Sequence, residues 1–348
     1  MSPIHLLGGG LSCAMGSHAP SCIAGIAAGL SRLVVVDSEI IREPVVCASA
    51  EGGTPFIKQP ARRIFNLLGD AVDGLLDGPR PRSTENIAMI VGWPHPKRAG
   101  APPCPSARAL ADALGSRIRS VVDPERVYPL TGETAGGRAL ALAARLLSDG
   151  QAIDACLVAA ADSWLSTPAL RWLSSRCPIR RTSSGEGIVP AEAGAAVWVV
   201  RAPPVGAPQL LGAHVTRVRG SESAVARLEA AIAGTLNAAS RSLADIQHVV
   251  IDSGTNAWGT TENRVAMARL GGRLWNGATL APAESIGHVG APAGIINALV
   301  AAYLLERHGR GGSALCVVNS GMSRRAAFVF GLESRATPSS REVIPWSL

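Results

Sequence analysis

The spacing of apolar residues divides the chain into short buried strands and amphipathic helices. Between residues 59 and 76 apolar side chains recur every three or four positions, which predicts a helix with one buried face. Unbroken apolar runs predict strands that are covered on both faces of their sheets. These runs lie at 86–92, 155–161, 192–201, 247–252 and 314–319.

The order of predicted strands and helices repeats after the break at Pro203 and Pro204. The strand ending at Gly92 matches one ending at Gly254, 162 residues further on, and Cys156 matches Cys316 at a separation of 160 residues. Nearly equal offsets from separate strands predict a duplicated α/β unit. We therefore expect two halves, residues 1–203 and 204–348, with the helix after Gly136 equivalent to the helix after His288.

Composition narrows the class of protein. Of the 348 residues, 47% are hydrophobic and 17% are charged, which is typical of a globular protein with a large core. No apolar run reaches the ~18 residues of a membrane helix, and no secretory leader is evident, so no membrane contact and a cytoplasmic location are expected. The seven cysteines form no C-x-x-C pair, and Cys156 and Cys316 lie in apolar runs typical of buried, inert thiols.

The net charge of +7 favours an acidic partner in a general way. Only 4% of residues are aromatic, and no basic stripe alternates with stacking rings, so a nucleic-acid partner is not expected. The densest basic stretch, residues 171–181, is most simply a solvated loop. A docking face for an acidic or phosphorylated protein is the sharper alternative.

The segment 284–294 is the sharpest candidate for chemistry. It is a polar, glycine-bearing turn that delivers His288 to the start of an apolar helix. A neutral imidazole there donates from one ring nitrogen and accepts at the other, as a ligand-facing group must. The structural alternative is a histidine that is hydrogen-bonded to the backbone at a helix start.

Five segments, in order, resemble the motifs of the β-ketoacyl synthase family. Residues 133–138 stand where that family has D-T-A-C-S-S, and 252–257 stand where it has A-H-G-T-G-T. Residues 283–288 correspond to K-S-x-x-G-H, 187–194 resemble G-x-x-x-G-E-G-A-G, and 319–321 keep part of N-S-F-G-F-G-G. The resemblance covers nearly the whole chain. It implies an α/β thiolase-like fold with duplicated halves in α-β-α-β-α layers, and a dimer.

The departures from these motifs predict a loss of condensing activity. The family's cysteine nucleophile is replaced by Gly136, its first histidine by Ser253 and its lysine by Ala283, while His288 is kept. Without the thiol no acyl thioester forms there. The backbone N–H groups of the helix start would still be available to an acyl or phosphate oxygen. Neither a cofactor nor a metal is expected.

The leading hypothesis is a catalytically silent homologue that works by association in fatty acid or polyketide-type synthesis. It would pair with an active ketosynthase as chain-length factors do, or help to bind an acyl group or an acyl carrier protein. A homodimer or a heterodimer is implied by the resemblance. In addition, the strand at 155–161 is expected to present an unpaired sheet edge, which a partner would cover.

Two alternatives stay open. One is an ester or thioester hydrolase in which Ser253 and His288 form a dyad, oriented by Asp252 or Glu284. The other is an adaptor that reuses only the scaffold. In the structural interpretation Asn256 is a turn residue, Glu284 is a helix-start acid, and Thr260 and Glu262 cap the next helix. Besides the tentative catalytic pair His288 and Ser253, the expected pocket residues are Thr134, Gly136, Gly137, Gly254, Thr255, Asn256, Glu284, Gly287, Asn319 and Ser320.

Overall fold

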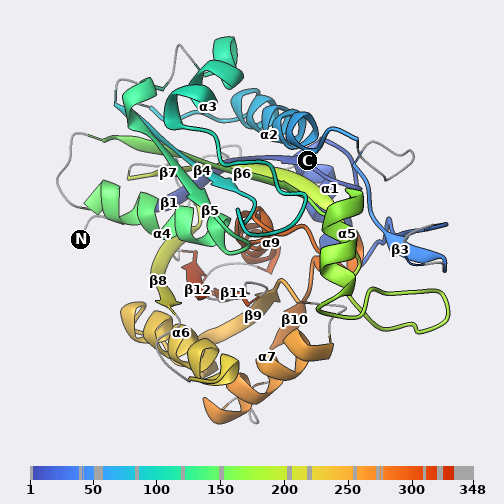
Figure 1. Cartoon of the computed structure of the whole chain (residues 1–348). Coiled ribbons are helices and arrows are strands. Elements are labelled where there is room, and N and C mark those ends of the chain that lie inside the picture. The colour runs from blue at the N-terminus through green and yellow to red at the C-terminus, as the bar shows by residue number, and fades with distance from the viewer. Residues whose placement is uncertain are drawn as a thin grey trace.

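Helices and sheets alternate in five layers, α-β-α-β-α, in the computed structural model of the chain (Figure 1). This is the layering that the sequence predicts. The structure describes residues 3–38, 41, 43–50, 58–82, 86–118, 122–148, 153–201, 206–217, 222–253, 257–271, 275, 277–308, 311–319 and 324–332.

The strands form one continuous hydrogen-bonded sheet order, β10-β9-β11-β12-β8-β1-β7-β6-β4-β5, and a separate β2-β3 hairpin. The strands that the first half of the chain contributes to the large sheet are β1 (His5–Ser12), β4 (Ile87–Trp93), β5 (Val127–Thr131), β6 (Ala155–Ser163) and β7 (Glu192–Val200). The others are β8 (Gln209–Arg217), β9 (Ile246–Ile251), β10 (Ala278–Leu280), β11 (Ser313–Val318) and β12 (Arg324–Gly331). The hairpin strands are β2 (Val34–Val36) and β3 (Val45–Cys47).

The strand order of the first half recurs in the second. The series β1-β7-β6-β4-β5 corresponds to β8-β12-β11-β9-β10, with the same succession of antiparallel and parallel neighbours. The two series join where His5 of β1 lies opposite Gln209 of β8. The sequence offsets of 162 and 160 residues link β4 with β9 and β6 with β11, which hold equivalent places. The boundary at residue 203 lies outside the described residues and stays a prediction.

In the described part of the chain, two helices cover the outer face of each half of the large sheet, and three lie between the two halves. Helices α2 (Pro60–Leu76) and α3 (Ala107–Leu114) cover the first-half strands, and α6 (Ala224–Ala238) and α7 (Ala257–Arg269) cover the second-half strands (Figure 1). The inner layer holds α1 (Ala19–Ala27), α4 (Ala135–Ser148) and α9 (Ala293–His308). Shorter helices are α5 (Thr167–Ser174) and α8 (Ala283–Ile286).

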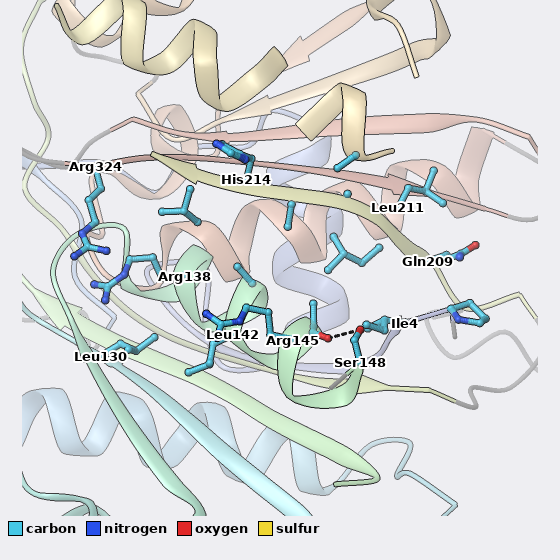
Figure 2. A pocket seen from close by; sticks show the side chains of 18 residues that line it. Ile4, Leu130, Arg138, Leu142, Arg145, Ser148, Gln209, Leu211, His214 and Arg324 are labelled. Atoms are coloured by element: carbon cyan, nitrogen blue, oxygen red, sulfur yellow. Dashed lines mark hydrogen bonds between the residues drawn. The ribbon is translucent and has the colours of Figure 1, made fainter. Parts of the chain in front are cut away.

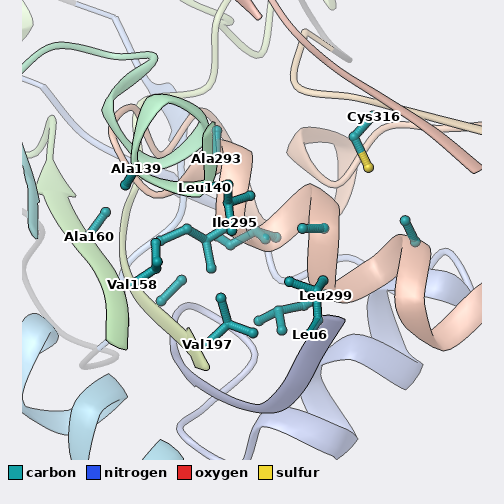
Figure 3. Packing of buried hydrophobic residues seen from close by; sticks show 14 of the residues in the cluster. Leu6, Ala139, Leu140, Val158, Ala160, Val197, Ala293, Ile295, Leu299 and Cys316 are labelled. Carbon is teal, nitrogen blue, oxygen red and sulfur yellow. The ribbon is translucent and has the colours of Figure 1, made fainter. Parts of the chain in front are cut away.

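The inner layer contains the main hydrophobic core, in which α4 and α9 pack between strands of both halves (Figure 3). Apolar residues surround α9 on all sides, since 12 of its 16 residues are buried. A helix in this position must be hydrophobic all round. That explains why the segment after His288 shows a nearly continuous apolar run rather than a striped pattern. Cys156 and Cys316 are fully buried, as expected, and burial raises the pKa of both thiols.

A buried ion pair ties α2 to β7. Arg63 Nη2 lies 2.6 Å from Glu192 Oε1, and both side chains are almost fully buried. Glu192 also accepts hydrogen bonds from the hydroxyls of Ser49 and Ser163 and from the backbone N–H of Ala50. Because the carboxylate has several donors, its burial is compensated. The Glu192 position of the fourth motif therefore has a structural function here.

Two expectations about the fold are wrong. The strand at 155–161 is not an edge, because β6 lies between β4 and β7 in the interior of the sheet. The edge strands of the described sheet are β5 and β10, and the exposed Pro129 of β5 lacks a backbone N–H. The basic stretch at 171–181 is not all loop, since Arg171 lies in α5 and the Arg176 guanidinium stacks on the Trp172 ring.

Because α4 and α9 approach each other closely, we expect a side chain at their contact to lower the free energy of unfolding. A Cβ on Gly294 would lie 2.4 Å from the backbone nitrogen of Gly137, so Gly294→Ala should lower the free energy of unfolding by about 1 to 3 kcal/mol in urea titrations. Gly74→Ala in α2 is the matched control, because its Cβ would meet nothing closer than 3.7 Å. The control should be neutral or stabilising by up to about 1 kcal/mol. Equal effects of the two substitutions would contradict the packing argument.

Candidate functional site

The first turns of α4 and α9 meet backbone to backbone where the sequence places the nucleophile turn. The Gly136 N–H donates to the Ala291 carbonyl oxygen, with a nitrogen to oxygen distance of 2.9 Å. A Cβ on Gly136 would lie 2.6 Å from that oxygen and 3.2 Å from Cγ1 of Ile295. Real Cβ atoms essentially never come so close to other atoms. A side chain at this position therefore requires the backbone of one helix start to move.

The expectation that the N–H groups of this helix start remain available to a ligand oxygen is wrong for two of them. The Ala135 N–H donates to the Gly132 carbonyl oxygen at 2.9 Å, and the Gly136 N–H donates to Ala291. Gly137 packs with its Cα side against the Phe328 ring, because a Cβ there would lie 3.0 Å from two ring carbons. The nucleophile turn is thus filled by backbone and core atoms.

His288 is held mainly through its backbone. Its N–H donates to the Val189 carbonyl oxygen at 2.7 Å, and its partly buried ring lies 5.1 Å from the Trp164 ring, between centroids. Burial, together with the Arg98 charge, lowers the pKa of His288 from 6.5 to about 4. The imidazole is therefore neutral at pH 7. No described residue forms a hydrogen bond with its ring.

Two glycines shape the turn around His288. Gly287 and Gly290 have φ values of 74° and 71°, in the left-handed region that glycine adopts readily. A Cβ on Gly287 would lie 2.6 Å from the Ala191 side chain, and one on Gly290 would lie 2.3 Å from Oδ2 of Asp162. Gly287 thus allows the turn to pack tightly on the chain before β7, and its place in a pocket stays a prediction.

A buried ion pair that sequence reasoning missed lies beside His288. Arg98 Nη2 is 2.6 Å from Oδ1 of Asp162, and both side chains are fully buried. Asp162 also accepts from the N–H groups of Ser163 at 2.7 Å and Ala291 at 3.2 Å. The Arg98 guanidinium lies 4.1 Å above the Trp164 ring. Asp162 therefore holds the start of α9 in place through Ala291, whose carbonyl oxygen closes the Gly136 position.

Arg98 is not fully satisfied by these contacts. Its Nε and Nη1 atoms are buried and have no hydrogen-bond partner among the described residues. The signal that could have found this pair is the position of Asp162 at the carboxyl end of an apolar strand, where polar side chains of α/β sheets collect. Its partner Arg98 lies 64 residues earlier in a proline-rich loop, and no periodicity marks it.

Glu133, at the turn before α4, is also buried, with 7% of its surface exposed. Burial raises its pKa from 4.5 to about 8; Arg98 and Arg325 oppose this shift, and Asp162 and Asp252 add to it. The carboxyl is therefore largely protonated at pH 7. In this state it can donate a hydrogen bond and does not compete with Asp162 for Arg98.

Ser253 lies in a separate network from His288. Its Oγ accepts from Nδ2 of Asn263 at 2.7 Å, and Gly259 packs against it so closely that a Cβ there would lie 2.4 Å from the Ser253 Cβ. No hydrogen bond joins Ser253 to His288 among the described residues. The structure therefore does not bring the two together as a hydrogen-bonded dyad, and the hydrolase alternative stays a prediction.

Asp252 and Asn319 connect the carboxyl ends of β9 and β11. The Asn319 N–H donates to Oδ1 of Asp252 at 3.0 Å, and its Nδ2 donates to the Gly259 carbonyl oxygen at 3.3 Å. The Oδ1 atom of Asn319 is buried and has no described partner. Asp252 thus bonds to a neighbouring loop, and among the described contacts it does not orient His288.

The expectation that Thr260 and Glu262 cap a helix is wrong. Helix α7 begins at Ala257, so both residues lie inside it. Glu262 pairs with Arg325 of β12, with Nη2 of the arginine 3.0 Å from Oε2. Both residues are buried, and the pair ties α7 to the sheet. The polar sequence from 254 to 264 hides this helix from a periodicity analysis.

The other expected site residues are dispersed. Thr134 is buried in the turn before α4, where its carbonyl oxygen accepts from the Arg138 N–H at 3.0 Å. Glu284 is exposed in α8 and lines a pocket of about 440 Å³ beside α7 rather than facing His288. Gly254, Thr255, Asn256 and Ser320 lie outside the described residues.

Within the described part of the chain, no group of three or more histidine, cysteine, aspartate or glutamate side chains has the arrangement of a metal site. Over the same residues, no helix has the length and apolar character needed to cross a bilayer.

No family model matches the chain, and no curated protein matches it by sequence. Solved structures match it over nearly its whole length. The ishigamide ketosynthase/chain length factor aligns over 95% of this chain and 100% of its own, with 19% identity and a TM-score of 0.67. A ketosynthase in complex with its chain length factor from Xenorhabdus doucetiae aligns over 95% and 98%, with 16% identity and a TM-score of 0.71.

A β-ketoacyl synthase from Burkholderia phymatum STM815 aligns over 96% of this chain and 100% of its own, with 14% identity and a TM-score of 0.70. At these identities the likeness establishes the fold. The chain has a thiolase-like fold. More particularly, it has the form of that fold found in ketosynthases and chain length factors, as the five sequence motifs imply.

The protonated state of Glu133 predicts a pH dependence of stability. A raised pKa stabilises the folded state fully below the unfolded value of 4.5, and this contribution is lost as the pH rises towards 8. His288, with its lowered pKa, has the opposite slope below pH 6.5. Between pH 6.5 and 8, ionisation of Glu133 should lower the free energy of unfolding of the wild type by roughly 2 kcal/mol, at about 1.4 kcal/mol per pH unit. Glu133→Gln should remove this decline.

Urea unfolding at several pH values measures this difference. Burial also raises the pKa of Glu306 to about 8, which adds a second decline of the unfolding free energy with pH. The wild type and the Glu133→Gln variant should both show this second decline. Parallel stability curves for wild type and Glu133→Gln would show that Glu133 is ionised in the folded protein.

Proposed function

We propose that the protein is a non-condensing partner subunit, similar to a chain length factor, that pairs with an active ketosynthase in acyl-carrier-dependent synthesis in the cytoplasm. The observation that carries this proposal is the closed Gly136 position. A condensing synthase must hold an acyl group on a side-chain nucleophile at this turn. Here the space for a Cβ lies within 2.6 Å of the Ala291 carbonyl oxygen.

The charge state of the surrounding groups supports the same proposal. His288 is neutral with a pKa of about 4, which makes it a weak base at pH 7. Glu133 has a pKa of about 8 and keeps its proton. Asp162 and Arg98 neutralise each other at 2.6 Å. In these charge states the groups support the packing of the two helix starts, as the Asp162 contact with the Ala291 N–H illustrates.

Two of the similar structures combine a ketosynthase with a chain length factor, which favours a partner role. One of them aligns over 95% of this chain and 98% of its own chain. The edge of the sheet offers a surface for pairing. Strand β5 bonds to β4 on one side, and its Tyr128, Pro129 and Leu130 are partly or fully exposed. An uncovered strand edge is a site at which another chain can pair. Binding of an acyl carrier protein would fit the net charge of +7.

The test is assembly with a ketosynthase that has an intact cysteine, identified by co-purification from the native host. Size-exclusion chromatography with light scattering should show a stable one-to-one complex, and the complex should form ketoacyl product while this chain alone forms none. Pro129→Glu should weaken assembly about tenfold or more, because it places a charge on the contact edge.

Arg241→Glu is the matched control, since Arg241 is exposed beyond the end of α6 and far along the sheet order from β5. Condensation by the isolated chain would refute the proposal. So would a chain that stays monomeric with every co-expressed ketosynthase.

A further inference from the structure

A second pocket, on the side of α4 that faces β8, is lined by residues from the first turn of α4 to its end. Its volume is about 780 Å³, within the range of small-molecule sites, and it extends from the end of β5 to the chain before β1 (Figure 2). Strand β8 contacts β1 only where Gln209 lies opposite His5, so the rest of its edge diverges from β1 and opens this space.

The charge of the pocket has one sign. Among the described residues that line it are Arg138, Arg145, Arg324 and His214, and none is an aspartate or a glutamate. Arg138 lies in the first turn of α4, where the helix dipole disfavours a cation. Arg138 Nη1 donates to the Thr131 carbonyl oxygen at 2.9 Å, and the cationic side chains of the lining raise the electrostatic potential of the cavity. The pocket therefore favours a negatively charged ligand.

The cations and the apolar surface are distributed along its length. Arg138 begins α4, and Arg324 begins β12 opposite the last residue of β8, so both mark one end. Ser148 ends α4 and Gln209 begins β8, so they mark the other end, beside Ile4 (Figure 2). The ten residues of α4 between these ends span about 15 Å. Between them the wall is mainly apolar, with Arg145 and His214 interrupting a surface made of Ala141, Leu142, Ala144, Leu210, Leu211, Ala213 and Val215.

We propose that this pocket binds an amphipathic anion, a carboxylate or phosphate head group on an apolar chain. The head group lies beside Arg138 and Arg324, where its oxygens accept charge-assisted hydrogen bonds from the guanidinium groups. The chain lies along Leu142 and Leu211, which are partly exposed in the empty pocket and become covered. Apart from Arg138, the site is built from residues outside the turn at 133–138, and it does not depend on pairing with a ketosynthase.

Isothermal titration calorimetry of the full chain tests this with four probes. Decanoate and decyl phosphate carry the chain with each head group, decanol carries the chain without charge, and inorganic phosphate carries charge without the chain. At least one of the two chain-bearing anions should bind saturably at one site. Decanol and inorganic phosphate should bind about tenfold more weakly or less.

Variants locate the binding. Arg138→Gln with Arg324→Gln, and separately Leu142→Glu, should each weaken the anion about tenfold or more, while Arg108→Gln on α3, whose side chain is 87% exposed, should leave it unchanged. Arg145→Gln is a milder variant at an exposed position that cannot unfold the core, and it should also weaken binding. Circular dichroism checks that each variant is folded.

Three results would overturn the proposal. The first is no saturable binding of either chain-bearing anion. The second is binding that the folded variants leave unchanged. The third is loss of ketosynthase pairing in Leu142→Glu without any change in anion affinity, which would assign the pocket to a protein contact instead.

Discussion

The structure depends on one contact, the backbone hydrogen bond between the Gly136 N–H and the Ala291 carbonyl oxygen at 2.9 Å. It joins the first turn of α4 to the residues just before α9, and these two helices hold equivalent places in the two halves. Gly136, Gly137 and Gly294 all lie at this contact, and a Cβ on any of them would come within about 3 Å of neighbouring atoms. The same feature that lets the two halves pack closely therefore removes the place for a nucleophile.

Electrostatic groups around this contact support it. Asp162 accepts from the Ala291 N–H and pairs with Arg98, so the ion pair fixes the strand end, the proline-rich loop and the start of α9 relative to one another. A buried pair of this kind adds little net stability, but loss of one partner leaves an uncompensated charge. Glu133 avoids that cost by keeping its proton, and His288 avoids it by staying neutral. The charged and neutral groups described around the turn thus stabilise the packing of the two helix starts, and they are not arranged to transfer a proton.

The sequence predicts the fold well because its strands are apolar runs and its motifs keep their order. The runs at 86–92 and 314–319 coincide with β4 and β11 within one or two residues, and the offset between halves links equivalent strands. The position of β6 inside the sheet was mispredicted because an apolar run does not show which neighbours it has. The start of helix α7 at Ala257 was missed, and Thr260 and Glu262 were expected to cap the helix, because its first turns are polar and show no period.

The candidate site was less predictable, for physical reasons. The sequence resemblance predicts that Gly136 stands at the nucleophile position, but the closure of its Cβ position by Ala291 is a tertiary contact. Arg98 and Asp162 lie 64 residues apart and share no motif. The resemblance predicts a histidine position at Ser253, yet the Ser253 hydroxyl accepts a hydrogen bond from Asn263, which lies in the helix that follows. Spacing in the sequence places such residues near one edge of the sheet without fixing their partners.

The most direct test of the account is to put the thiol back. Gly136→Cys should remain unacylated when it is incubated with acyl and malonyl carrier thioesters, as judged by intact mass and peptide mapping, because Ala291 and Ile295 occupy the space of its side chain. The same variant should lose about 1 to 3 kcal/mol of unfolding free energy. An acyl adduct mapped to residue 136 in a protein as stable as wild type would contradict the account.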